Sequence, residues 1–77
     1  MTDAYVHVVV ETTAMQQAAT EIADAPPVEQ VRMVTGEYDL VAQLDVESKD
    51  AIADAVSEHV HPVSGVVETV TNVAFEP

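Results

Sequence analysis

Residues 34–40, Val-Thr-Gly-Glu-Tyr-Asp-Leu, form a short polar turn between two apolar runs, residues 28–34 and 40–46. Gly36 can take a positive φ at no steric cost, and its bare backbone leaves the main chain open to a small ligand. Asp39 lies at the mouth of the following strand, where its carboxylate could meet an ammonium group. The stretch predicts a strand–turn–strand unit. Its turn either holds a small zwitterion such as an amino acid or simply faces water, since turns are commonly built from Gly, Asp and Asn.

The runs on both sides of this turn alternate as strands do, because successive side chains of a strand point to opposite faces. After the turn, one clean apolar face is formed by Leu40, Ala42, Leu44 and Val46. Before the turn we predict a strand over residues 28–35. One face of this strand carries Val31 and Met33. The other face carries Val28, Gln30, Arg32 and Val34.

Upstream of this unit the sequence predicts a strand and a helix. Residues 4–10 are apolar on both faces except at His7, which is typical of a central strand covered on both sides. Thr13 and Gln16 fit a capping box. Helical spacing then predicts a helix of roughly 14–24, with apolar positions at Met15, Ala18, Ala19, Ile22 and Ala25. The proline pair that follows ends this helix.

Downstream of the unit the sequence predicts a second helix and a last strand. Ser48 is a good N-cap, and Asp50 in the first turn suits the helix dipole. The helix presents an apolar stripe of Ile52, Ala53, Val56 and Val60 and stops before Pro62. The last strand, residues 66–75, has one unusual face made of Val67, Thr69, Thr71, Val73 and Phe75. Its threonine hydroxyls can hydrogen-bond a ligand side by side or pair with a neighbouring strand.

The element order is therefore βαββαβ. This order is that of the ferredoxin-like α+β fold: a four-stranded antiparallel sheet with both helices on one face. The other sheet face then stays bare although it is rich in Val, and an apolar face of this size marks an interface. We expect dimerisation through the sheets.

Size and charge limit the classes of function. The chain has 77 residues, so it forms one domain (1–77). It has no Cys and therefore no disulfide, so oligomerisation is the remaining common way to stabilise a domain this small. Its 14 Asp and Glu face only two cations, Lys49 and Arg32, for a net charge of −12. Such a chain is repelled by nucleic acid and by anionic membranes. The acids are scattered over the whole chain, which favours a protein adapted to the high-salt cytoplasm of a halophile, with a mesophilic acidic protein as the alternative.

No targeting or membrane segment is indicated. The N-terminus is not basic, and no apolar run approaches the roughly 18 residues of a membrane span. The sequence therefore predicts a soluble cytoplasmic protein.

Two motifs resemble a known family. Residues 34–40, and the segment His61-Pro62-Val63-Ser64-Gly65-Val66-Val67-Glu68-Thr69-Val70-Thr71-Asn72-Val73, are similar to the effector and assembly (RAM) domain of the Lrp/AsnC, or feast/famine, regulators. The resemblance covers nearly the whole chain, and the family's element order agrees with the order worked out above. Family members usually carry an N-terminal helix-turn-helix. This chain begins at the first strand, so it resembles a stand-alone RAM protein that does not bind DNA itself.

The resemblance also implies partners and a site. It implies sheet-to-sheet homodimers, assembly of dimers into rings such as octamers or decamers, and an amino-acid effector bound between dimers. We expect such a protein to act by joining full-length Lrp/AsnC regulators or a partner enzyme. The ligand would lie against Gly36, with Asp39 at its ammonium group and the backbone of Thr35, Gly36, Glu37 and Tyr38 at its carboxylate. Thr69 and Thr71 would add hydroxyl groups.

Other chemistry is weakly indicated. His59 and His61 straddle a helix end, where histidines commonly interact with the helix dipole, so we predict no metal site. With only 2 Gly, phosphate-binding loops are absent, and no cofactor is indicated. His7 is most simply a core or interface residue. Two alternatives to a regulatory module stay open: a small ferredoxin-like enzyme of the monooxygenase or isomerase type, which would use His7, and an assembly scaffold without a ligand.

Overall fold

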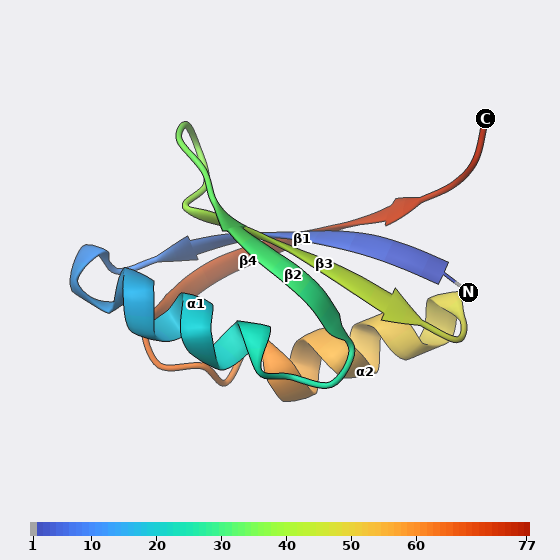
Figure 1. The fold of residues 1–77 in the computed structure, drawn as a ribbon, viewed down its shortest axis with the longest axis horizontal. Coiled ribbons are helices and arrows are strands. Elements are labelled where there is room, and N and C mark those ends of the chain that lie inside the picture. Colours follow the sequence, from blue (N-terminus) through green and yellow to red (C-terminus); the bar gives the residue numbers. More distant parts are fainter. Residues whose placement is uncertain (1) are drawn as a thin grey trace.

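A computed structural model describes residues 2–77 and has the predicted element order (Figure 1). The elements are β1 (Thr2–Val10), a 3₁₀ turn η1 (Thr12–Ala14), α1 (Met15–Ala23), β2 (Val28–Met33), β3 (Leu40–Val46), α2 (Lys49–His59) and β4 (Val66–Ala74). No helix within residues 2–77 is long and apolar enough to cross a membrane.

The strands form one antiparallel sheet in the order β2-β3-β1-β4, and both helices cover the same face of it (Figure 1). This is the ferredoxin-like α+β arrangement that the element order predicted. The central pair is held in register by partners such as Val8 with Leu40 and Ala4 with Leu44. β4 pairs with the other side of β1, so that β2 and β4 are the edge strands.

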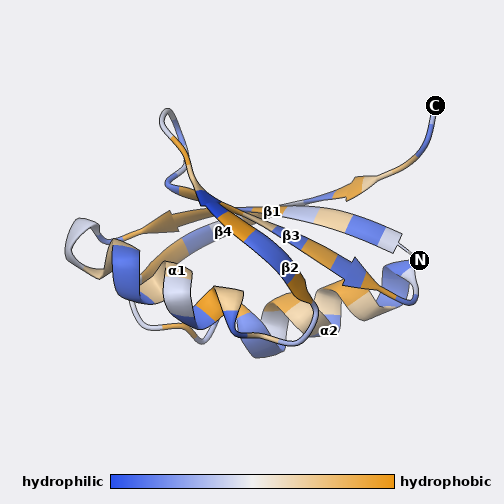
Figure 2. Ribbon diagram, viewed as in Figure 1, coloured by the Kyte–Doolittle hydropathy of each residue, from blue (hydrophilic) through white to orange (hydrophobic). Residues whose placement is uncertain are grey.

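The core lies between the sheet and the helices. The alternation predicted for β3 is confirmed, since its residues are buried at every second position from Leu40 to Val46. β1 alternates in the same way, with Ala4, Val6, Val8 and Val10 buried. The expectation that β1 is covered on both sides is not met within one copy of the chain, because Tyr5 on its other face is 38% exposed. In Figure 2 most of the C-terminal part of β1 is coloured as hydrophobic.

Two bulges change the predicted faces of the edge strands. The register of β2 shifts between Val28 and Gln30, so Val28 and Val31 both pack against the core although they are three residues apart. The prediction placed Val28 on the opposite face and was wrong there. In β4 the shift lies opposite Val9 and Val10, and it turns Val66 toward the core in the same way. Edge strands are common places for such bulges.

The helix starts also differ from the prediction. The capping box at Thr13 and Gln16 is wrong: the chain forms the 3₁₀ turn there, and neither η1 nor α1 begins with a side-chain cap. Ser48 does occupy the N-cap position of α2, but its hydroxyl makes no capping hydrogen bond. Instead the Ser48 carbonyl accepts from the Ala51 N–H at 3.1 Å. β2 and β4 end at Met33 and Ala74, slightly before the predicted ends.

The sheet face opposite the helices is open in one copy. We call it the open face; it carries Tyr5, His7, Val9, Val41, Gln43 and Val70 in its centre, as the register of the strands shows. The loop between β2 and β3 and the C-terminal residues after β4 both rise on this side of the sheet (Figure 1). The open face is therefore bordered by two projecting segments.

Candidate ligand-binding site

The predicted turn between β2 and β3 is present and closed by the backbone. The Val34 N–H donates to the Asp39 carbonyl at 2.9 Å. Gly36 has a φ of +113°, the positive value expected of it. The side chains of Thr35 and Glu37 are exposed at the tip, while Tyr38 and Asp39 are half-buried. The tip thus offers free backbone groups beside a half-buried carboxylate.

Asp39 also has a structural role. Its backbone N–H donates to the Val8 carbonyl at 2.9 Å, and its Oδ2 accepts from the Val10 N–H at 3.0 Å. Val10 lies beyond the last β1–β3 pair, Val8 with Leu40, so its N–H needs another acceptor. Asp39 supplies that acceptor with Oδ2, and its Oδ1 makes no hydrogen bond among the described residues. This role is not evident from the sequence pattern, although an Asp next to the residue that pairs with Val8 is placed to fill it.

Tyr38 joins the turn to the open face. Its ring meets the ring of His7 edge-on, with centroids 5.1 Å apart and an angle of 78° between the planes. His7 Nδ1 is buried and has no hydrogen-bond partner among the described residues. His7 is therefore a packing residue of the open face, and its ring contacts the turn through Tyr38.

We predict that Tyr38→Ala loosens this turn. Edge-to-face aromatic pairs contribute about 0.5–1.5 kcal/mol beyond their buried area. The free energy of unfolding should therefore fall by at least about 1 kcal/mol, because the half-buried ring also loses its buried area. Thermal unfolding would detect this change. Tyr38→Phe keeps the ring and should unfold like the original chain. If the Ala variant unfolds like the Phe variant, the contact with His7 does not hold the turn.

The two threonines lie in a separate groove, between α2 and β4. Its volume is about 430 Å³, and we call it the α2–β4 groove; it is lined by Lys49, Ile52, Ala53, Val56, Ser57, His61, Thr69, Thr71 and Val73. Thr69 Oγ1 lies 3.0 Å from His61 Nε2, so the two side chains share a hydrogen bond. Thr71 is exposed beside them. The threonine-rich face of β4 is therefore neither core nor strand-pairing surface.

One copy does not bring the turn and the threonines together. No residue of the turn lines the α2–β4 groove. The turn rises on the open side of the sheet, whereas Thr69 and Thr71 face α2 on the other side (Figure 1). The predicted site residues thus lie in two separate places, the turn and the α2–β4 groove.

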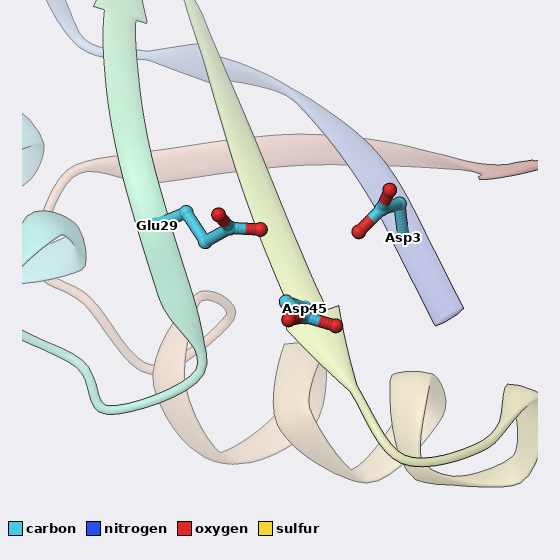
Figure 3. Close-up of side chains that lie close together, drawn as sticks. All are labelled: Asp3, Glu29 and Asp45. Carbon is cyan, nitrogen blue, oxygen red and sulfur yellow. The ribbon is translucent and has the colours of Figure 1, made fainter. Parts of the chain in front are cut away.

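The remaining titratable groups form no comparable site. His59 lies 3.8 Å from Glu58 at the end of α2, and His61 bonds Thr69 instead of joining His59. On the open face, Asp3, Glu29 and Asp45 come from three strands and gather with oxygens within 4.8 Å of one another (Figure 3). Asp45 Oδ1 is buried there without a hydrogen-bond partner. Such a cluster repels itself, and dissolved cations relieve the repulsion.

The family follows from a comparison of sequences. Residues 3–77 match the family described as the Lrp/AsnC ligand binding domain. The chain belongs to this family. An uncharacterized HTH-type transcriptional regulator of Pyrococcus abyssi is 31% identical over 61 residues, which are 79% of this chain and 41% of that protein. The Lrp/AsnC domain therefore spans about two fifths of the length of the curated relatives it matches.

Solved structures agree with this assignment. TTHA0845 from Thermus thermophilus is 32% identical to this Lrp/AsnC domain, with a TM-score of 0.93 over 100% of this chain and 96% of that one. A transcriptional regulator of Neisseria meningitidis, solved as an L-Met complex, has a TM-score of 0.86 at 19% identity over 97% of this chain and 50% of that one. The second likeness shows the shared fold. The family is one of transcription regulators, and its relatives are named as such.

Proposed function

We propose that this Lrp/AsnC domain binds an amino acid between its own copies and thereby regulates the assembly of transcription regulators, without contacting nucleic acid itself. The observation that carries the proposal is the division of the predicted site into two half-sites, the turn around Gly36 and the α2–β4 groove. A ligand that bridges them stabilises the assembled form over the separate copies. The ligand concentration thereby sets the fraction of assembled protein.

The half-sites offer complementary chemistry for an amino acid. Asp39 has a free carboxylate oxygen for the ammonium group, and the exposed backbone of residues 35–37 offers N–H groups for the carboxylate. Thr69 and Thr71 supply hydroxyl groups from the second half-site. The L-Met complex of the Neisseria regulator, which has the same fold, supports this class of ligand.

The open face supports the first step of assembly. In its centre Tyr5 is 38% and Val70 is 36% exposed, and both are residues that a second copy would cover. A domain of this size without a disulfide has a small core, so burying the open face against a second copy would add to its stability. The ring of dimers implied by the family would then bring the turn of one dimer to the α2–β4 groove of the next. Full-length regulators of the same family are the proposed partners in the cell.

The charge supports the absence of direct DNA contact and the proposal of a high-salt environment. A net charge of −12 with two cations repels phosphate backbones, whereas molar salt screens the repulsion among the acids. The enzyme alternative receives less support, because His7 is the only residue proposed for catalysis and it does not line the α2–β4 groove. His7 is also absent from the linings of two other hollows, one near Asp3 and one near Asp24.

The test is a thermal-shift screen of the purified domain in molar KCl against the proteinogenic amino acids, with light scattering on each hit. A ligand at 100 times its dissociation constant stabilises a protein by about 2.7 kcal/mol, and each kcal/mol moves the midpoint by roughly 4–8 °C in a domain this small. We expect one or two amino acids to raise the midpoint and the assembled mass together. A stable oligomer that no amino acid shifts would instead favour a scaffold.

A further inference from the structure

The two cations of this acidic chain are unevenly placed with respect to its hollows. Two further hollows, of about 620 and 310 Å³, have acids in their linings: the first has Asp3 and Glu76 together with Lys49, and the second has Asp24. The α2–β4 groove has no acidic residue in its lining and contains Lys49 and His61. It is the one hollow of the three whose lining has a cation and no acid, so it suits a negative group best.

Lys49 is free to meet such a group. Within residues 2–77, no carboxylate lies within 4.0 Å of its ammonium group, because the single ion pair there is His59 with Glu58. The other cation, Arg32, is on β2, whose register places it beside Val41 on the open face. Only Lys49 therefore brings a permanent positive charge to the groove.

The rest of the groove sets the shape of the ligand. Ile52 and Val56 of α2 and Val73 of β4 give it an apolar floor that can hold methylene groups. Beside this floor, Thr69 and His61 are linked by their hydrogen bond, and Lys49 is a second polar contact at the start of α2. This arrangement matches a short aliphatic chain that ends in an acid.

From these contacts we propose that the effector is an amino acid with a carboxylate side chain, which enters the α2–β4 groove and pairs with Lys49. The inference rests on the proposed function, because the turn around Gly36 takes the ammonium and α-carboxylate groups and leaves the side chain for the groove. An ion pair that stays exposed contributes a factor of about 1.4 to 5 in affinity.

The test compares isosteric ligands. L-Glu and L-Gln, and L-Asp and L-Asn, differ in charge but hardly in shape, so thermal-shift titrations at constant KCl isolate the contribution of the charge. We expect the acid of at least one pair to bind about fivefold more tightly than its amide. In Lys49→Gln that ratio should fall to about one. Arg32→Gln removes the same charge outside the groove and should keep the ratio. Because Arg32 lies on the open face, light scattering on this control checks that its assembly is unchanged.

The outcomes separate this inference from the proposed function. If only apolar amino acids or amides shift the midpoint, the inference is overturned and the proposed function stands. If no amino acid shifts it, the proposed function itself fails. Lys49 also lines the acid-rich hollow with Asp3 and Glu76. A Lys49→Gln variant that loses stability without ligand but keeps the ratio would assign Lys49 to that hollow and overturn the inference.

Discussion

Replacing Gly65 with Ala is expected to lower the free energy of unfolding by about 2–4 kcal/mol. Gly65 precedes β4 with a φ of +93°, a conformation that costs any residue with a Cβ. A Cβ at this position would also overlap the Cβ of Ala14 in η1. The position cannot simply move away, because the Gly65 carbonyl accepts from the Glu11 N–H at 2.9 Å.

This expected loss is large beside the total stability of native proteins, which is about 5–15 kcal/mol. The midpoint of thermal unfolding should fall by about 10–30 °C, measured in molar KCl at one protein concentration. Gly36→Ala is the matched control. Gly36 has a φ of +113°, but a Cβ added there meets nothing within 4 Å. It should show the backbone strain alone, about 1–2 kcal/mol.

The double variant Gly65→Ala with Ala14→Gly tests the cause. Removing the Ala14 Cβ relieves the overlap, so the double variant should regain part of the lost stability although Gly is less favourable than Ala in a helical turn. Equal midpoints for Gly65→Ala and Gly36→Ala, or a double variant less stable than Gly65→Ala, would show that the packing of β4 against η1 does not decide the effect.

The fold could be predicted because the sequence patterns are local. Every second residue from Leu40 to Val46 is apolar, and the sheet buries those residues. The element order then leaves few topologies. The faces of Val28 and Val66 could not be predicted in this way, because each depends on a bulge in an edge strand. A bulge is decided by how two strands fit together, which the period of one strand does not contain.

The ligand-binding role of the site residues stays a prediction, but the positions of these residues can be compared with the expectation. The turn around Gly36 has the expected conformation, and the Thr-rich face of β4 lines a groove as a ligand surface would. The edge contact of Tyr38 on His7 joins residues 31 positions apart, which no local pattern indicates. The hydrogen bond from Val10 to Asp39 spans 29 positions and is missed for the same reason.

Asp39 gives the second large prediction, because its carboxylate has both a structural bond and the proposed bond to the ligand. In Asp39→Ala the Val10 N–H loses its acceptor. Hydrogen bonds to charged groups contribute about 1.5–3 kcal/mol, and an unsatisfied donor is costly. The midpoint should fall by about 10 °C. The amino-acid shift should vanish with it, since the ammonium group loses its partner.

Asp39→Asn separates the two roles. Its amide oxygen can still accept from Val10, so most of the stability should return, but the negative charge is gone. We expect the Asn variant to unfold close to the original chain and to show no shift with the amino acid that stabilises the original. Glu37→Gln is the control, since it removes a neighbouring exposed carboxylate of the same turn and should keep both properties.

The comparison of these three variants decides what the turn is for. If Asp39→Asn keeps the full ligand shift, Asp39 only anchors the turn to β1, and the ammonium group binds elsewhere. If Asp39→Asn is as unstable as Asp39→Ala, the charge itself is needed at the end of β1, and loss of binding in either variant says little about contact with the ligand. If the Asp39 carboxylate binds the ammonium group, Asp39→Asn should be stable but show no midpoint shift with the ligand. Glu37→Gln should keep that shift. Because Oδ2 already accepts a hydrogen bond from the Val10 N–H, the ammonium group would bind to Oδ1.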